Sequence, residues 1–170
     1  ACVAFGLTAS SAYVLNDLNI VYLSVGDVER SLEVGREAQQ LWQELGNQPM
    51  LVDSLAGAVG AEYFAGNYDR AIELAERGDR ISQSIGNLWG QAYSRMYVGY
   101  VYEDLGELDR ALETMEMCLR LSKEAGFMAP LGITKADLGV LYVRLGAAER
   151  GLDLLRSALA VSQTQVAPWQ

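Results

Sequence analysis

Two sets of glycines, each recurring at the same constant interval, constrain the fold of this chain more than any other feature. The first set opens a five-residue motif that ends in arginine, and it comprises Gly26, Gly66, Gly106 and Gly146. The matching arginines are Arg30, Arg70, Arg110 and Arg150. The second set comprises Gly6, Gly46, Gly86 and Gly126. Two markers that stay in phase over four copies indicate an internal repeat, which is the signature of a solenoid.

Between the glycines, apolar residues recur at the spacing of an α-helix. After Arg110, for example, they stand at Leu112, Met115, Cys118 and Leu119, which places them on one helical face. A glycine just beyond such a stretch suits the left-handed residue that ends many helices. The polar residues that follow Gly26, Gly66 and Gly106 favour a new helix start. Each unit is therefore predicted to contain helix A, a tight turn, helix B and a longer joint.

The predicted chain is all-α, with four antiparallel helix pairs that stack because one pair alone cannot bury its apolar stripe. The A helices are expected near residues 11–25, 50–65, 89–105 and 129–145, and the B helices near 27–45, 67–85, 107–125 and 147–164. Residues 1–10 are interpreted as the end of a preceding repeat helix and its joint. The four repeats then span about 11–50, 51–90, 91–130 and 131–165, and residues 166–170 form a tail.

These units resemble the tetratricopeptide repeat family in a small set of positions. The third unit carries Val98-Gly99, Tyr102, Gly106, Ala111 and Cys118, and the fourth carries Leu138-Gly139, Tyr142, Gly146 and Ala158. The first unit has Asn19 in place of the helix-A glycine. The second has Ala58-Val59 in place of Leu-Gly and Glu62 in place of tyrosine.

The repeat length, about 40 residues from one turn glycine to its next equivalent, is similar to that of kinesin light chains and of bacterial signalling and transcription-activator repeat domains. Because the common repeat has about 34 residues, we expect the extra length at the end of helix B and in its joint. The resemblance implies a right-handed α-solenoid that binds a protein or peptide on a concave face lined by the A helices.

Carried onto this sequence, the resemblance places ten residues on that face: Tyr13, Asn16, Asp53, Tyr63, Tyr93, Met96, Tyr97, Tyr100, Glu103 and Arg144. Tyrosine is prominent among them, and its large apolar ring with one polar tip suits a protein interface. In the alternative interpretation, Tyr97 and Tyr100 pack between helices. Either way, this set is our predicted partner-binding site.

Other polar and aromatic residues leave alternatives open. Arg95 and Lys135 are either snorkelling side chains or a cationic spot that faces Asp53, Asp137 or a partner's carboxylate. The four motif arginines start helices, where the dipole disfavours a cation, so we expect carboxylates of a joint or neighbouring unit to offset them. Trp42 and Trp89 either fill joints or serve as exposed anchors, and Trp169 lies in the predicted tail.

Composition narrows the class of function. The net charge of −9 disfavours nucleic acid as a partner. The chain has no histidine, which excludes catalytic sites that use histidine and metal sites that have histidine ligands. It also has no phosphate-binding glycine loop with Lys-Ser/Thr. We expect no enzyme activity, metal or cofactor. No apolar segment is long enough for a membrane span, and Cys2 and Cys118 suit a reducing cytoplasm.

The sequence therefore predicts a protein-protein interaction module, within a larger and bacterial signalling or regulatory protein. One alternative is a ligand-sensing domain that controls an attached ATPase, cyclase or DNA-binding domain. Another is a homodimerisation module. Membranes and nucleic acid are not expected as partners of this segment.

Overall fold

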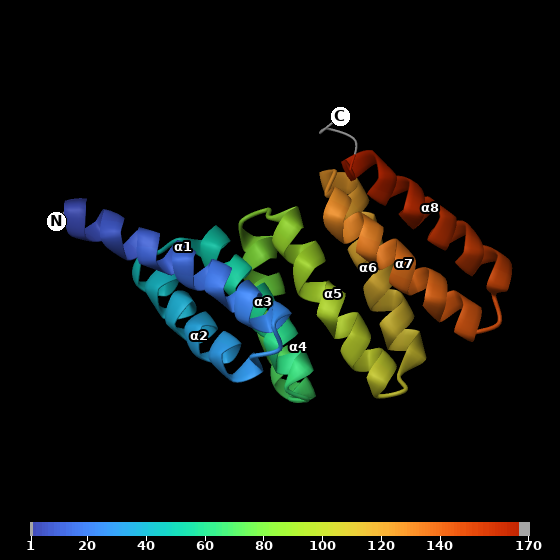
Figure 1. Cartoon of the computed structure of the whole chain (residues 1–170), viewed down its shortest axis with the longest axis horizontal. Helices are drawn as coiled ribbons and strands as arrows, with labels where there is room; N and C mark the ends of the chain where they lie inside the picture. Colours follow the sequence, from blue (N-terminus) through green and yellow to red (C-terminus); the bar gives the residue numbers. More distant parts are fainter. Residues whose placement is uncertain (1, 167–170) are drawn as a thin grey trace.

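Eight antiparallel α-helices form a single row in the computed structural model, which describes residues 2–166 (Figure 1). They are α1 (Cys2–Ser24), α2 (Val28–Glu44), α3 (Gln48–Phe64), α4 (Tyr68–Ser84), α5 (Leu88–Asp104), α6 (Leu108–Ala125), α7 (Met128–Arg144) and α8 (Ala148–Val166). The prediction of an all-α chain of stacked helix pairs is confirmed. Across the described residues, no helix combines the length and apolar character needed to cross a membrane.

The same glycine turn joins every helix to the next. In the first turn Gly26 is left-handed, with a φ of 82°, and its N–H donates to the Leu23 carbonyl. The N–H of Asp27 reaches back to the Tyr22 carbonyl at 2.9 Å, which completes a Schellman motif. Asp27 then caps α2 by accepting from the Arg30 N–H. Seven glycines, one per turn, have this positive φ, as the sequence predicted for the helix ends.

The turns after B helices are no longer than those after A helices, so the predicted longer joint after helix B is wrong. The helices α2 to α7 begin at a constant interval, and five of these six contain 17 residues while α6 contains 18. The physical reason is that Gly46, Gly86 and Gly126 close the same hydrogen-bonded turn as the other glycines. The length by which this repeat exceeds the common one therefore extends helices rather than joints.

Helix α1 also differs from the sequence prediction, because residues 2–10 form no separate helix end and joint. The helix runs unbroken from Cys2 to Ser24, with Gly6 inside it. A glycine within a helix costs only about 1 kcal/mol relative to alanine. Since Gly6 is followed by Leu7, which cannot cap a new helix, nothing local forces a break there.

The odd-numbered helices form the inner layer of the stack. Each helix packs against its neighbours in sequence, but α1, α3, α5 and α7 also contact one another in succession. No such contact occurs between successive even-numbered helices in the described part of the chain. Layers with closer spacing lie on the inside of a curve, so the row bends with the odd-numbered helices on its inner side.

Side chains of complementary size hold the two helices of each pair together. One position on the odd helix faces one on the even helix in the pairs Asn19–Gly35, Gly99–Met115 and Gly139–Leu155. The equivalent positions of the second unit hold Val59 and Ala75, which are both buried in the core. A Cβ at Gly99 would lie 2.6 Å from the Met115 Cγ, so a large partner fills the space a glycine leaves. The replacement of the helix-A glycine in the first two units is therefore compensated within each pair.

Tyrosine rings stabilise three of the four motif arginines, which stand at helix starts where the dipole disfavours a cation. In three units the arginine lies over the tyrosine at the end of its own A helix, with guanidinium-to-centroid distances of 5.8 Å for Arg30–Tyr22, 4.0 Å for Arg110–Tyr102 and 4.0 Å for Arg150–Tyr142. Carboxylates also contribute. Arg150 pairs with Glu116 of the preceding unit at 2.8 Å, as expected.

The second unit, which has no tyrosine at this position, uses a different contact. Glu62 stands there instead and accepts a hydrogen bond from the Asn67 side chain at 2.8 Å. Arg70 pairs with Glu73, one turn along α4, at 2.6 Å. The arginine-tyrosine contact is thus a property of units one, three and four.

The complementary pairs make a testable prediction. Gly99→Val should destabilise the fold by about 1–3 kcal/mol through overpacking. Met115→Ala should cost about 2–5 kcal/mol through a cavity. The double variant recreates the Val59–Ala75 pair of the second unit, so its loss should be smaller than the sum by about 1 kcal/mol or more. Urea unfolding followed by circular dichroism measures all three, and additive losses would contradict the pairing.

Candidate protein-binding face

The inner layer presents a row of aromatic and acidic side chains, which we call the inner face. On α5 it consists of Tyr93, Tyr97, Tyr100 and Asp104, which follow one helical face at spacings of four, three and four. The neighbouring helices contribute Asp53, Tyr63 and Phe64 from α3, and Asp137, Val140 and Arg144 from α7. Three helices that are far apart in sequence thus build one surface.

An aromatic cluster occupies the region where α3 meets α5. The ring centroids of Tyr63 and Tyr100 are 5.8 Å apart, and those of Tyr97 and Tyr100 are also 5.8 Å apart. Phe64 lies against both Tyr63 and Tyr97, at 5.1 and 6.2 Å. Tyr97 packs over Gly60, where any Cβ would lie 2.8 Å from its ring. These rings therefore pack between helices while leaving Phe64 exposed.

A second aromatic pair lies towards the start of α5. The Trp89 and Tyr93 rings stack at 4.8 Å with an angle of 19° between their planes. Burial raises the pKa of Tyr93 to about 12, and the nearby Tyr97 and Asp53 act in the same direction. Tyr93 is thus a neutral phenol at physiological pH. It places a hydrogen-bonding hydroxyl near a carboxylate.

Asp53 is held by a polar network beneath this pair. The Asn16 amide donates to Asp53 Oδ2 at 2.8 Å, and Ser54 donates to the Asn16 carbonyl oxygen. The Trp42 indole N–H reaches the same oxygen at 3.4 Å. Burial raises the pKa of Asp53, the hydrogen bond from Asn16 opposes the rise, and the charge of Asp17 adds to it. The network fixes the direction of this carboxylate.

Acidic groups continue along the inner face towards α7. The Tyr100 hydroxyl donates to Asp137. Burial raises the pKa of Asp137 above its ordinary value, and the hydrogen bond from Tyr100 opposes part of that rise. The Tyr68 hydroxyl donates to Asp104 at 2.9 Å. Glu103 pairs with Arg144, a cation that α7 contributes to the inner face. The face is therefore aromatic and predominantly acidic.

Two predicted partner-binding residues are buried instead. Asn16 is 7% exposed within the Asp53 network, and Met96 is 6% exposed against Ala92 and Cys118. Successive residues in a helix point about 100° apart. Because Tyr97 points to the inner face, Met96 turns into the space between α5 and α6. The sequence alone could not resolve a shift of one residue.

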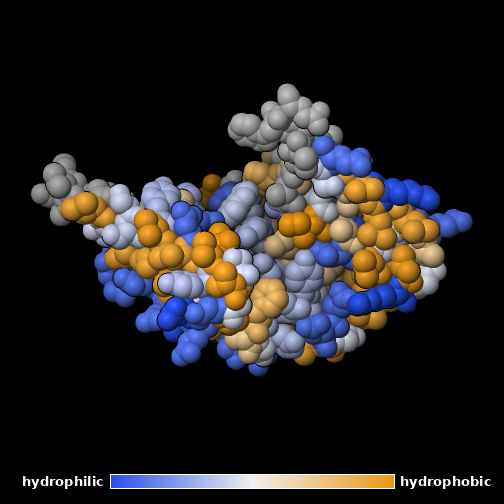
Figure 2. Space-filling view, in the orientation of Figure 1, coloured by the Kyte–Doolittle hydropathy of each residue, from blue (hydrophilic) through white to orange (hydrophobic). Residues whose placement is uncertain are grey.

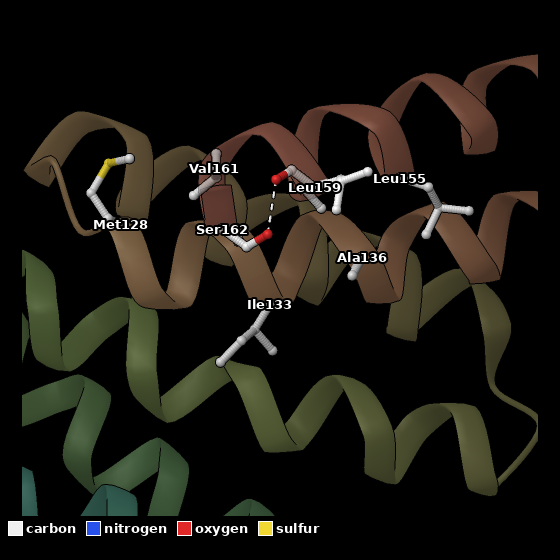
Figure 3. A pocket seen from close by; sticks show the side chains of 9 residues that line it. Met128, Ile133, Ala136, Leu155, Leu159, Val161 and Ser162 are labelled. Atoms are coloured by element: carbon white, nitrogen blue, oxygen red, sulfur yellow. Dashed lines mark hydrogen bonds between the residues drawn. The ribbon is translucent and has the colours of Figure 1, made fainter. Parts of the chain in front are cut away.

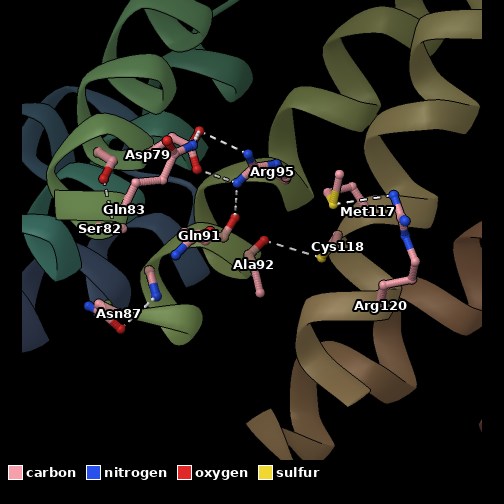
Figure 4. Close-up of polar contacts among 12 residues, drawn as sticks. Asp79, Ser82, Gln83, Asn87, Gln91, Ala92, Arg95, Met117, Cys118 and Arg120 are labelled. Atoms are coloured by element: carbon pink, nitrogen blue, oxygen red, sulfur yellow. Dashed lines mark hydrogen bonds and ion pairs between the residues drawn. The ribbon is translucent and has the colours of Figure 1, made fainter. Parts of the chain in front are cut away.

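Arg95 and Lys135 do not form the suggested cationic spot facing Asp53 or Asp137. Arg95 forms a bidentate ion pair with Asp79 of α4, in which Nη2 lies 2.8 Å from Oδ2 (Figure 4). Arg95 also donates to the Gln91 carbonyl. Lys135 donates to Ser157 of α8 at 2.8 Å. Both side chains thus link an odd helix to an even one.

The remaining predicted residues have varied positions. Tyr13 is half-exposed and packs edge-on against Trp42, with 4.8 Å between centroids. Trp42 itself is 1% exposed, so it fills the core rather than serving as an anchor. Trp169 lies outside the described residues.

Cys118 has a structural environment. Its thiol contacts the Ala92 carbonyl at 3.2 Å (Figure 4). It also lies 3.3 Å from the Thr134 hydroxyl, and burial raises the pKa of the thiol. Within residues 2–166, no group of acidic and thiol side chains is placed to hold a metal ion.

Sequence reasoning missed Phe64, Tyr68 and Asp104 as inner-face residues. Phe64 and Asp104 occupy equivalent positions in successive repeats, one helical turn beyond Gly60 and Tyr100. The signal was therefore available in the repeat. Tyr68 begins an even-numbered helix and reaches the inner face through its long side chain, which only the tertiary structure could show.

Comparison with solved structures identifies the fold. RapI superposes with a TM-score of 0.76 at 18% identity, over 92% of this chain and 57% of that one. Aspartyl phosphate phosphatase F from Bacillus subtilis gives 0.80 at 12% identity, over 94% and 42%. A kinesin light chain with TPR-like repeats from Podosopora anserina gives 0.65 at 17% identity, over 92% and 77%.

These similarities show that the chain has a tetratricopeptide-type repeat fold. It spans little more than half of RapI and less than half of the phosphatase. No protein-family model matches the sequence, and comparison with curated proteins finds no relative.

Asp53 provides a test of the site's electrostatics. Because its pKa is raised in the folded state, the folded protein binds more protons than the unfolded one just above pH 3.8, so stability falls as pH rises through that window. Asp53→Asn removes this effect, and its carbonyl can still accept from Asn16. We expect the variant to be at least as stable at pH 7 and to gain less stability on acidification.

Urea unfolding at pH 7 and near pH 4 measures this difference. Glu113→Gln, a neutralisation at an exposed site on α6, is the control and should leave the pH dependence nearly as it is in the native chain. A destabilised Asp53→Asn at neutral pH would show that the buried carboxylate stabilises the fold.

Proposed function

We propose that this chain is a protein-interaction scaffold whose inner face binds a peptide or an extended segment of a protein. The observation that carries the proposal is the continuous aromatic surface formed by Tyr63, Phe64, Tyr97 and Tyr100 across α3 and α5. Aromatic side chains dominate the energetics of protein interfaces, and phenolic hydroxyls add directional hydrogen bonds. The tetratricopeptide-type fold, whose inner layer is one long surface, supports the same function.

The charge of the inner face favours a basic partner. Asp53 and Asp137 are held in place by hydrogen bonds from Asn16 and Tyr100, and Asp104 accepts from Tyr68. A lysine or arginine side chain could pair with these carboxylates and also lie over a tyrosine ring. Such pairing would also offset the cost of the partly buried acids.

The cellular setting belongs to the same proposal and rests on the resemblance to long-repeat signalling proteins. We place the module within a larger bacterial protein of signalling or transcription regulation, in the cytoplasm. In the ligand-sensing alternative, the same face would dock a small molecule or another domain of the same protein. The extended aromatic surface favours a peptide, because it spans two helices rather than enclosing a cavity.

Peptide selection tests the proposal directly. Short random peptides displayed on phage and selected on the immobilised chain should be enriched in lysine, arginine and apolar residues. A selected synthetic peptide, titrated by calorimetry, should bind Tyr93→Ala/Tyr100→Ala at least about tenfold more weakly. Asp53→Asn should also weaken binding, and high salt should reduce the affinity of the native chain.

Tyr22→Ala is the matched control, because Tyr22 lies under Arg30 at the first turn. It should retain the affinity of the native chain, and circular dichroism should show equal helicity for all variants. Selection of peptides without basic residues, or equal affinity for the Tyr93/Tyr100 double variant, would refute the proposed site.

A further inference from the structure

An apolar groove of about 460 Å³ lies between α7 and α8 at one end of the row. Met128, Ile133 and Ala136 line it from α7, and Leu155, Leu159 and Val161 line it from α8 (Figure 3). Leu159 is 60% exposed and Ile133 is 46% exposed. No charged residue lines the groove, and no described segment of the chain packs over it.

The internal repeat shows what kind of element covers such a groove. Four of its residues, Gly132, Ala136, Ala158 and Val161, stand one repeat after Ala92, Met96, Cys118 and Leu121. In the third unit those residues form a buried cluster next to α7. Thr134 of α7 lies 3.3 Å from the Cys118 thiol. The equivalent surface of the fourth unit is thus shaped to receive an odd-numbered helix.

The opposite end of the row carries a helix of that kind with an uncovered face. Leu7, Val14 and Val21 recur at two-turn spacing along α1, and each is more than half exposed. Figure 2 shows apolar side chains gathered along this helix, at the left of the view. Val14 is equivalent to Thr134, which α7 directs towards the preceding unit, and Val21 is equivalent to Leu141, which is fully buried.

The two faces also match each other at two positions where internal interfaces are polar. Between α4 and α5, Asp79 pairs with Arg95. The equivalent positions in the groove and on α1 are Leu159 and Leu15, which are both apolar. Where Thr134 meets Cys118 between α7 and α6, the equivalents are Val14 and Ala158. At these two positions the polar contact is replaced by apolar residues on both sides. The Glu116–Arg150 pair between α6 and α8 has Arg156 and Arg30 as its equivalents, and both of these cations are exposed to solvent rather than buried.

We propose that α1 of a second copy of this chain occupies the α7–α8 groove, so that copies associate head to tail and continue the solenoid. This surface is distinct from the inner face, and the inference does not depend on the proposed function. Because the two contacting faces differ, the association is heterologous, and it produces rows or rings rather than a closed symmetric dimer. The net charge of −9 on each copy opposes association, so salt should strengthen it.

Two single variants test the polarity of the contact. Val14→Asp disables the α1 face and leaves the groove intact, whereas Leu159→Asp disables the groove and leaves α1 intact. Sedimentation velocity should show concentration-dependent oligomers larger than dimers for the native chain, and monomers for each variant alone. An equimolar mixture of the two variants should form dimers and nothing larger, because each complex has one intact contact and two disabled ends.

Val25→Asp, which adds the same charge at an exposed valine beyond the end of α1, is the control and should associate like the native chain. We expect each disabling variant to weaken association at least about tenfold, with unchanged helicity. A native chain that stays monomeric at high concentration and high salt would overturn the proposal. So would dimers formed by either disabling variant alone, because they would indicate a symmetric contact, or a mixture that remains monomeric.

Discussion

The left-handed glycine turn is the constraint on which the rest of this structure depends. A Schellman motif ends a helix at a fixed residue. Here it recurs at a constant interval, and in most turns a polar N-cap residue follows it. Helices of nearly equal length follow, and equal helices can stack in register. Those turns make positions in successive repeats equivalent, and the packing of every unit depends on that equivalence.

Within that frame, the four units use different side chains for the same task. The pairs Asn19–Gly35 and Gly99–Met115 place the bulk on opposite helices, yet both fill the space between an odd helix and an even one. Close packing requires only that the summed volume and shape agree. This freedom explains how the first two units depart from the family pattern in helix A while keeping the same turn positions.

The inner face contains tyrosines whose packing stabilises the fold and carboxylates whose burial is unfavourable. Its tyrosines pack between helices and also present polar edges, so the two alternatives considered for Tyr97 and Tyr100 are not exclusive. Asp53 and Asp137 are partly buried, and burial raises the pKa of both carboxyl groups. Folding gains nothing from the desolvation of a carboxylate. The basic partner that we propose would supply a positive charge to pair with them.

The sequence by itself determined the helical repeat, the glycine turns, the stacking of helix pairs and the aromatic character of α5. These features follow from local chemistry, because short stretches of sequence specify left-handed residues and helical periodicity. Only the tertiary structure decided that Met96 is buried while Tyr97 faces inward, that Arg95 pairs with Asp79, and that Phe64 and Tyr68 join the site. Each depends on helix rotation and on partners distant in sequence, where one residue of shift turns a side chain by about 100°.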